Sequence, residues 1–444
     1  MMTLKSKAAQ SLVLLALLVT AGCGPAAPDA APPTPGGGEG PGPADISLAI
    51  SDRPRDLSPA ADPDDLAALA DANAAFAFDL YHVLAADDGN LFFSPHSISV
   101  ALAMTYAGAS GDTASQMAST LHFTLPPDPL HAAFNAYSLD LQARAEAEVE
   151  GTPFELSIAN SLWGQQGFPF LPEFLDVLGE NYGAGMRLVD YTSDPEAARL
   201  AINQWVSDET REKIQDLIPP GAIDALTRLV LANVIYFKAE WLHPFDPDTT
   251  QPAPFHLLDG STVDVPMMHQ QEPYGYMLGD GFQAVELPYE NGDVSMLVIL
   301  PDEGQFQSVE EALGPALVQG IADDLIHAPV ILSLPKFTYE SAFGLNDALR
   351  SLGMTDAFDL DRADFSGMDG NRDLYIGSVL HKAFVSVDEN GTEAAAATAV
   401  IMELTSALPG EPIVFTVDRP FIFLIRDSRT GGILFVGRVM APEQ

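Results

Sequence analysis

The most constraining feature of this 444-residue sequence is a long segment near its C-terminal end, Glu389–Ser406, which lies between two strand-like runs. Four consecutive alanines, Ala394–Ala397, stand in its first half, and beyond Gly391 it has no glycine or proline until Pro409. A surface loop of this length normally carries turn residues. The segment therefore predicts a stretch of chain that is not a strand when the protein first folds but is able to become one later.

The alternation of side chains along this segment supports the prediction. One set of alternate positions is small and then apolar, and it comprises Thr392, Ala394, Ala396, Thr398, Val400 and Met402. The other set contains Glu393 and Glu403, so one face of such a strand would be buried and the other would meet solvent. An alanine-rich helix, which Ala and Glu both favour, or a linker is the alternative on composition.

Helical patterns dominate the first half of the chain and strand patterns the second half, without an internal repeat. The expected helices are Leu66–Ala85, Ala133–Ala147, Pro172–Tyr182 and Gly344–Leu352. The expected strands are Phe154–Trp163, Arg228–Trp241, Phe282–Pro288, Val294–Pro301, Ile331–Tyr339, Lys382–Val387 and Ile413–Val417. This order predicts a single α+β domain in which helices pack on large, mostly antiparallel β-sheets.

The N-terminus indicates an export signal. Lys5 and Lys7 form a short basic region, Ser11–Thr20 is mostly apolar, and small residues precede Cys23. The apolar run is too short for an ordinary membrane span. The pattern resembles a bacterial lipoprotein signal in which Cys23 becomes the lipid-bearing first residue. It predicts export and anchoring to the cell envelope, at the outer membrane or the cell surface, with an ordinary secretory signal and an incidental cysteine as the alternative.

A tether is expected to follow the signal. Residues 24–45 carry seven prolines and six glycines, and the biased composition continues to about Ala60. Such a segment cannot form a core, and as a flexible coil it would reach roughly 30–37 Å. We therefore divide the chain into a signal peptide (1–22), a lipidated cysteine and tether (23–60) and a folded domain (61–444).

Charge and missing motifs exclude several classes of function. The formal net charge is −42, from 62 acidic and 20 basic residues, which argues against binding to nucleic acids or polyanions. Cys23 is the only cysteine, so no intrachain disulfide can form. The sequence has no Gly-x-Ser-x-Gly, His-Glu-x-x-His or phosphate-binding loop, and we expect no catalytic residue, metal or cofactor. An enzyme of another class remains as an alternative.

The run from Val387 to Val400 resembles the hinge and reactive-centre loop of the serpins, in the form that their inhibitory members carry. The resemblance covers roughly Asp62–Gln444 and implies the serpin fold, with an exposed reactive-centre loop. It assigns the hinge to Glu389, Gly391, Thr392, Glu393, Ala394, Ala395, Ala396 and Ala397. Glycine lets the backbone swing, and Thr392 must be buried first on insertion, so a charge at this position would stall it.

The same resemblance places four polar residues beneath the centre of the main sheet: Ser94, Ser97, Asn233 and His381. Hydroxyl, amide and imidazole groups can satisfy one another in a buried network that holds central strands together. Four unrelated polar groups that cap helices and strands are the alternative. Trp241 stands at the serpin position near which the loop enters the sheet.

The resemblance also places the bond that a protease would cleave. Counting Glu389 as the first residue of the loop, the seventeenth is Thr405, so the bond is Thr405–Ser406, with Leu404 as the alternative specificity residue. Thr405 suits a pocket of the elastase type and Leu404 a chymotrypsin-like one. The absence of Lys and Arg from Gly391 to Asp418 argues against a trypsin-like target. Their absence from Gly111–Leu125 predicts no polyanion activator.

The resemblance implies an inhibitor of serine or cysteine endopeptidases. The protein would act as a monomer that forms a covalent acyl complex with its target and then inserts the cleaved loop as an extra strand. A non-inhibitory serpin that acts as a surface binding protein is the alternative.

Overall fold

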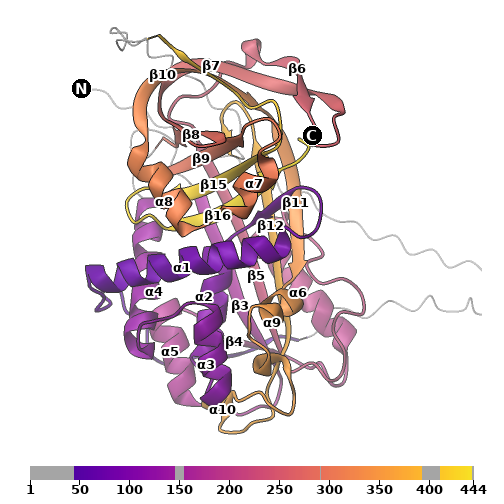
Figure 1. Cartoon of the computed structure of the whole chain (residues 1–444). Helices are drawn as coiled ribbons and strands as arrows, with labels where there is room; N and C mark the ends of the chain where they lie inside the picture. The colour runs from indigo at the N-terminus through magenta and orange to yellow at the C-terminus, as the bar shows by residue number, and fades with distance from the viewer. Residues whose placement is uncertain (1–44, 146–154, 291, 393–410, 443–444) are drawn as a thin grey trace, which may run out of the picture. The chain divides into compact units, whose positions relative to one another are not determined.

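The computed structural model describes residues 45–145, 155–290, 292–392 and 411–442 (Figure 1). Its helices are α1 (Pro63–Leu84), α2 (Pro95–Tyr106), α3 (Gly111–Thr120), α4 (Pro127–Ala145), α5 (Pro172–Tyr182), α6 (Pro195–Glu209), α7 (Phe306–Glu311), α8 (Pro315–Asp324), α9 (Asn346–Ser351) and α10 (Ser366–Asp369). Several of these helices begin with a proline, which cannot donate a backbone hydrogen bond and is therefore tolerated in the first turn.

One of two large sheets is seven-stranded, in the order β1-β4-β3-β5-β13-β12-β11. Its strands are β1 (Ser47–Ala49), β3 (Glu155–Gln165), β4 (Met186–Val189), β5 (Leu229–Glu240), β11 (Phe337–Gly344), β12 (Ile376–Val387) and β13 (Gly391–Thr392). Below the short β13, β5 and β12 pair with each other directly, and this pairing is parallel. The sheet therefore has a seam at its centre that β13 occupies only at one end.

The other sheet is nine-stranded, in the order β14-β10-β7-β8-β9-β15-β16-β2, with β6 paired to β7. Its strands are β2 (Leu91–Phe93), β6 (Gln251–His256), β7 (Thr262–Leu278), β8 (Phe282–Pro288), β9 (Val294–Pro301), β10 (Ile326–Pro335), β14 (Ile413–Thr416), β15 (Phe421–Asp427) and β16 (Ile433–Val439). Most pairings in the two sheets are antiparallel, which confirms the predicted α+β class.

Helix α2 lies between the sheets and contacts β3, β5 and β16, while α1 crosses it (Figure 1). Every residue of α2 from Pro95 to Thr105 is buried. Ser94 caps the helix, because its hydroxyl accepts a hydrogen bond of 3.1 Å from the backbone N–H of Ser97. The capped end of α2 therefore points its polar groups at the underside of the seven-stranded sheet.

The prediction of one strand over Ile331–Tyr339 is wrong, because the chain changes sheets within that range. β10 pairs with β7 in the nine-stranded sheet, and β11 pairs with β12 in the seven-stranded sheet. Between them, the N–H of Lys336 donates to the carbonyl oxygen of Pro266 at 2.9 Å. Lys336 therefore stands at the corner where the two sheets meet.

The expected tether is also too long at its C-terminal end, because residues from Ser47 onward contact the folded domain. β1 pairs antiparallel with β4 at the edge of the seven-stranded sheet. Farther along, Arg53 forms ion pairs of 3.1 Å with Asp176 and 2.8 Å with Glu180 on α5. The expected tether thus ends before Ser47 rather than at residue 60.

Among the described residues, no helix combines the length and apolar character needed to cross a bilayer.

Candidate functional site

The predicted hinge begins inside the seven-stranded sheet. β13 lies between β5 and β12 and is antiparallel to both. On one side Gly391 pairs with Glu240 and Thr392 pairs with Ala239, and on the other Thr392 pairs with Val387. The structure therefore places the first two residues after Asn390 as a short wedge at the end of the seam.

The remaining loop residues of the prediction lie outside the described residues, and so does the lipidation site. They are Cys23, Glu393, Ala394, Ala395, Ala396, Ala397, Leu404, Thr405 and Ser406.

Glycine is required at 391 for close approach of two strands. A Cβ atom at this position would overlap the carbonyl oxygen of Ala239 and come within 2.8 Å of the Cα of Glu240. Both neighbours are backbone atoms of β5, which cannot move aside cheaply. The sequence analysis explained Gly391 by its backbone freedom alone. The structure adds a second reason for glycine at this position, which is that no side chain fits against β5.

Thr392 is buried and its hydroxyl lies 2.7 Å from the phenolic oxygen of Tyr289. The Tyr289 ring stacks on Trp241, with ring centroids 4.7 Å apart and planes inclined by 7°. Burial raises the pKa of Tyr289, so the phenol stays neutral. Either of the two hydroxyl groups can then donate the hydrogen bond to the other. A charged or bulky side chain at 392 would displace this contact.

The turn before β13 is held by Trp241. Its indole Nε1–H donates to the carbonyl oxygen of Asp388 at 3.0 Å, and its backbone N–H donates to the carbonyl oxygen of Asn390 at 2.8 Å. The Asp388 carboxylate accepts from the backbone N–H groups of Asn390 at 2.8 Å and Gly391 at 3.3 Å. Burial raises the pKa of Asp388, although these N–H groups partly offset the effect.

Glu389 fixes the turn to the corner between the two sheets. Its carboxylate accepts from Lys336 Nζ at 2.6 Å and from the Thr250 hydroxyl at 2.8 Å, and its carbonyl oxygen accepts from the N–H of Phe245 at 2.8 Å. Burial alone would raise the pKa of Glu389, but the bonds from Lys336 and Thr250 outweigh it and lower the pKa. The carboxylate is therefore ionised and anchored.

The four polar residues predicted beneath the sheet lie together. The Asn233 amide donates to the Ser97 hydroxyl at 2.6 Å, and its oxygen is hydrogen-bonded to Nδ1 of His381. The N–H of Ser94 donates to Nε2 of His381 at 3.2 Å. This network joins the start of α2 to β5 and β12, which are the two strands on either side of the seam.

Asn160 of β3 is a further member that sequence reasoning missed. Its side-chain oxygen accepts from the Ser97 hydroxyl at 3.2 Å and from the Asn233 amide. Its own amide donates to the carbonyl oxygen of Ser97 at 3.2 Å. An asparagine within the strand-like run at 154–163 was the available signal, because a polar group in a buried strand needs partners.

The contacts of His381 define its protonation state. Since Nε2 accepts from the N–H of Ser94, the ring proton resides on Nδ1 and is donated to Asn233. Burial lowers the pKa of His381 to about 3, against a smaller opposing effect of Asn233. The ring is therefore neutral at physiological pH, and it acts as a hydrogen-bonding link rather than as a charge.

The described residues contain no group of three or more His, Cys, Asp or Glu side chains that could hold a metal ion. The residues of the hinge and of the network beneath the sheet offer contacts between strands. Their arrangement is suited to a change of strand pairing at the seam.

Comparison with known proteins agrees with this architecture. The sequence model of the family described as "Serpin (serine protease inhibitor)" matches residues 71–442. An uncharacterised serpin-like protein of Thermococcus kodakarensis is 42% identical over 369 residues, which cover 83% of this chain and 84% of the relative. Leukocyte elastase inhibitor A of Rattus norvegicus is 41% identical over 385 residues, which cover 84% of this chain and 99% of the relative.

The fold matches solved structures as well. The crystal structure of human thyroxine-binding globulin superposes with a TM-score of 0.75 at 32% identity, covering 86% of this chain and 100% of that protein. With the fold, the family model and relatives of more than 40% identity in agreement, the chain belongs to the serpin family.

Proposed function

We propose that this chain inhibits serine endopeptidases, and cysteine endopeptidases by the same route, as a suicide substrate whose cleaved loop inserts into the seven-stranded sheet. The observation that carries the proposal is the seating of β13 between β5 and β12. The wedge already has the antiparallel direction that an inserted strand needs. Insertion would extend it down the seam and replace one parallel pairing by two antiparallel ones, which are slightly more stable per residue.

The two registers of β13 agree on where an inserted loop would go. Extending the pairing of Thr392 with Ala239 along β5 brings Thr398 opposite Asn233. Extending the pairing of Thr392 with Val387 along β12 brings the same residue, Thr398, opposite His381. Asn233 and His381 are themselves register partners across the closed seam. Insertion would therefore open their hydrogen bond and place a threonine hydroxyl between them.

The energy of this rearrangement is sufficient for an irreversible step. About a dozen new strand residues, each contributing roughly 0.5–1.5 kcal/mol of net hydrogen bonding, give a gain on the order of ten kcal/mol. The target protease would form its acyl-enzyme with its own catalytic groups, so this chain contributes no catalytic residue. Movement of the tethered protease across the molecule would then distort its active site before the acyl bond is hydrolysed.

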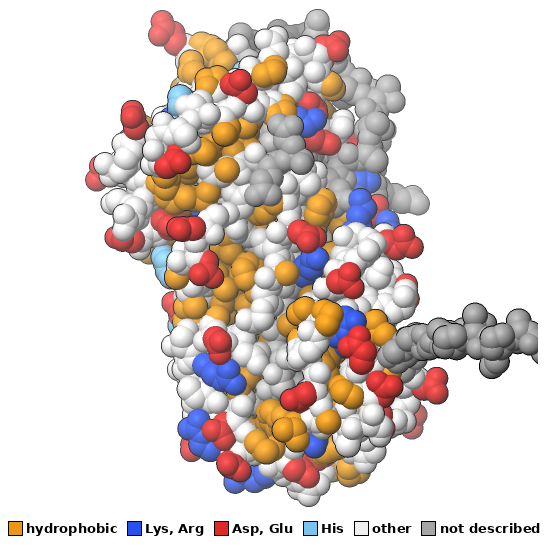
Figure 2. All heavy atoms as spheres, turned by 90° about the vertical axis from the view of Figure 1, so that its right-hand side faces the viewer, with side chains coloured by type: hydrophobic (Ala, Val, Ile, Leu, Met, Phe, Trp, Pro, Cys, Tyr) orange, Lys and Arg blue, Asp and Glu red, His pale blue; other side chains and the backbone are white. Residues whose placement is uncertain are grey.

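For the cleaved bond we propose Thr405–Ser406, with Leu404 as the alternative, and a target of the elastase or chymotrypsin type. The name of the rat relative, leukocyte elastase inhibitor, supports a small uncharged specificity residue. We further propose that the protein is exported and held at the bacterial cell envelope through a lipid on Cys23. Figure 2 shows acidic side chains spread over the visible face, as expected for a protein that does not bind polyanions.

The test is to incubate the purified protein with pancreatic elastase, chymotrypsin or subtilisin and look for a complex that survives denaturing gel electrophoresis. Mass spectrometry of the complex identifies the acylated residue, with Thr405 expected. Failure to form a covalent complex with any of these enzymes, together with simple cleavage in the loop, would refute inhibition.

A second candidate is a serpin that binds a ligand at the surface and inhibits nothing, since thyroxine-binding globulin is among the structural neighbours. Thermal melting separates the two. Cleavage within 393–410 should raise the melting midpoint strongly for an inserting inhibitor and hardly at all for a non-inserting relative.

A further inference from the structure

A cavity of about 200 Å³ lies beneath β3, between that strand and the helices α2 and α4. Its apolar wall includes Val100 and Met104 of α2, Leu141 of α4 and Ile158 of β3. An engineered apolar cavity of about 150 Å³ takes up benzene, so this space suits a molecule built on one small ring.

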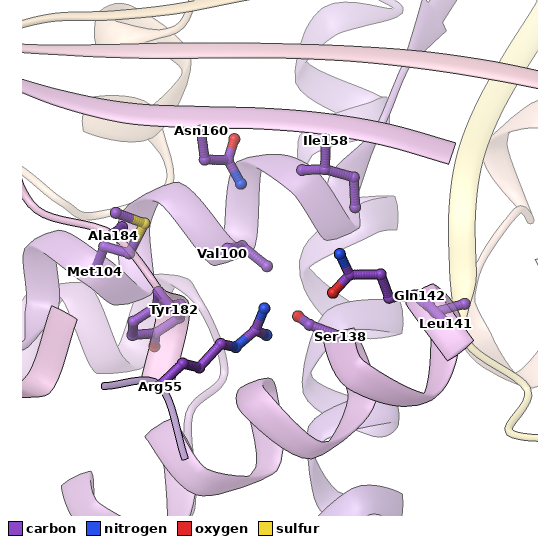
Figure 3. A pocket seen from close by; sticks show the side chains of 10 residues that line it. All are labelled: Arg55, Val100, Met104, Ser138, Leu141, Gln142, Ile158, Asn160, Tyr182 and Ala184. Carbon is purple, nitrogen blue, oxygen red and sulfur yellow. The ribbon is translucent and has the colours of Figure 1, made fainter. Parts of the chain in front are cut away.

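The polar wall of the cavity carries a positive charge. Arg55, from the segment that follows β1, extends into the space, and Ser138 and Gln142 of α4 line it as well. Figure 3 shows the guanidinium of Arg55, the hydroxyl of Ser138 and the amide of Gln142 turned toward one another, with Val100 and Ile158 across the open space. The cavity therefore has a polar end and an apolar end.

Arg55 has no acidic partner among the described residues. Its one hydrogen bond to them runs from Nε to the side-chain oxygen of Asn135, at 2.9 Å. Asn135 is fixed in turn, because its amide donates to the carbonyl oxygens of Asp56 at 2.7 Å and Glu180 at 3.2 Å. This bond orients the guanidinium and leaves both of its terminal NH₂ groups directed at the cavity. Burial lowers the pKa of Arg55, and no neighbouring carboxylate opposes it.

This lack of a partner is unusual in so acidic a chain. The neighbouring Arg53 forms ion pairs with two carboxylates, and the half-buried Arg144 and the buried Arg438 are paired as well. A guanidinium presents a fork of N–H groups that matches a carboxylate in two parallel hydrogen bonds. An arginine held in a pocket without its own acid therefore offers that fork to a ligand.

A second hollow of about 490 Å³ shares Arg55, Ile158, Asn160, Tyr182 and Ala184 with the cavity. Arg187 lines it, with its guanidinium carbon 4.8 Å from the ring centroid of Trp205. Arg187 makes no ion pair with a described residue, but Glu209 lines the same hollow and partly offsets its charge, raising the pKa of Arg187 against the larger lowering effect of burial. The hollow adjoins the cavity, and the positive charge that an anion meets there without an acidic neighbour is that of Arg55.

We propose that this cavity binds a small organic monocarboxylate, with its carboxylate on Arg55, Ser138 and Gln142 and its apolar body against Val100, Leu141 and Ile158. A ligand of this kind would have about the size of benzoate or a short-chain fatty acid. The geometry requires both parts of the ligand, because the charge meets Arg55 and the apolar body fills the remaining volume.

Occupancy would oppose opening of the sheet, a consequence that rests on the function proposed above. Asn160 and Ile158 of β3 line the cavity, and Asn160 is hydrogen-bonded to Ser97 in the network beneath the seam. β3 is paired with β5 over ten register positions, so movement of β5 away from β12 must carry β3 with it. A ligand packed between β3 and the helices favours the closed position. It would slow insertion and increase the fraction of inhibitor that is cleaved without trapping the protease.

The binding test uses isothermal titration calorimetry with benzoate on the intact protein at fixed ionic strength. We expect a dissociation constant of about 1 mM or tighter. Benzyl alcohol lacks the charge and sulfate lacks the apolar body, so each should bind at least about tenfold more weakly. Binding of sulfate as tight as that of benzoate, or no heat with benzoate at these concentrations, would overturn the proposal.

Three variants locate the site. Arg55→Gln removes the charge and Ala184→Leu fills the cavity from another wall, and each should weaken benzoate binding at least about tenfold. Arg53→Gln is the matched control, because Arg53 belongs to the same segment but borders only the outer hollow, with its charge paired to Asp176 and Glu180, and binding should be unchanged. Equal loss in Arg53→Gln and Arg55→Gln would assign the effect to the segment as a whole and refute the site.

The consequence for inhibition has its own readout. Saturating benzoate should raise the number of inhibitor molecules consumed per protease trapped, and Arg55→Gln should abolish this effect. If benzoate binds but this number does not change, the coupling to the sheet is wrong while the site stands. If the protein traps no protease at all, the proposed function fails and calorimetry still decides whether the cavity binds the carboxylate.

Discussion

The side chains of His381 and Asn233 are hydrogen-bonded across the seam between β12 and β5, and the two residues are also partners in the parallel register of those strands. The closed seam is thus locked at one position by a side-chain bond and along its length by the backbone ladder. β13 stands six residues farther along β5, where the same seam is already open.

Replacing Thr392 by arginine should convert the inhibitor into a substrate. Thr392 is buried against Tyr289, and an arginine there would have to leave its charge unpaired inside the sheet. The number of inhibitor molecules consumed per trapped protease should rise at least about tenfold, equivalent to ~1.4 kcal/mol in the partition between trapping and release. Thr392→Ser keeps the hydroxyl and should behave as the parent chain. Undiminished complex formation by Thr392→Arg would rule out insertion.

A charge at Thr398 should stop insertion later than a charge at Thr392. The registers of β13 bring this residue between Asn233 and His381, on the face that meets the start of α2. We expect Thr398→Arg to form less covalent complex and to gain less thermal stability after cleavage than the parent chain. Glu393→Arg places the same charge on the opposite face and serves as the control. Identical behaviour of the two variants would contradict the register.

Gly391→Ala should destabilise the intact protein. The added methyl group meets the backbone of β5 at Ala239 and Glu240, so the wedge must shift or leave the sheet. We expect a loss of about 1–3 kcal/mol in the free energy of unfolding, measured by chemical denaturation. Gly320→Ala on α8 meets no atom within 4 Å and should be neutral or stabilising by up to ~1 kcal/mol. A neutral Gly391→Ala would show that the wedge is not a fixed part of the fold.

Lys336→Met should loosen the turn before the hinge. It removes the ammonium group that lies 2.6 Å from the Glu389 carboxylate, whose side chain is only 9% exposed. The loss should be about 1–2 kcal/mol, limited by the partial exposure of the lysine. Glu389→Gln in the same background should then cost little more, which a double-mutant cycle measures. Arg211→Met breaks an exposed ion pair with Glu155 and should change stability by less than about 0.5 kcal/mol.

The intact protein should lose stability as the pH falls from 7 to 5. Burial lowers the pKa of His381 to about 3 and those of His96 and His131 to about 4. The unfolded chain binds these protons near pH 6.5, so between that value and the folded pKa the unfolded state binds more protons and acid favours it. Each residue should cost about 1.4 kcal/mol per pH unit between pH 6.5 and its folded pKa.

The variant His381→Gln tests the origin of this acid sensitivity. It should reduce the slope of unfolding free energy against pH by about one proton, besides lowering stability at pH 7 through its lost hydrogen bonds. A slope equal to that of the parent chain would show that His381 does not enter the acid transition.

Sequence patterns located the helices and strands whose apolar residues recur with a regular period. α5, β8 and β9 were predicted with the bounds that the structure has, because each lies between unambiguous breakers. β7, the longest strand, was not predicted, since Pro266 and Pro273 interrupt its pattern. In the structure each proline is paired with another proline, at Pro252 and Pro329, where the ladder tolerates a missing donor.

The segment before α1 shows a different limit. Its composition continues that of the preceding proline- and glycine-rich stretch, which favoured the prediction of a tether. The alternation of Ile46, Leu48 and Ile50 was the signal for β1, but a strand of three residues at the edge of a sheet depends on a partner that sequence alone does not show. The anchoring of Glu389 by Lys336 and Thr250 was hidden for the same reason, because its partners are distant in sequence.

The position of the three tryptophans gives the molecule an optical reporter of its own. Trp163 and Trp205 lie edge to face with centroids 5.7 Å apart beside Arg187, whereas Trp241 is bonded to the carbonyl oxygen of Asp388 at the root of the loop. Replacing Trp163 and Trp205 by phenylalanine would leave Trp241 as the only tryptophan, which can be excited at wavelengths that the 11 tyrosines do not absorb. The fluorescence emission of Trp241 would then report, in real time and without an attached dye, a change in the turn at Asp388 when the loop changes its position.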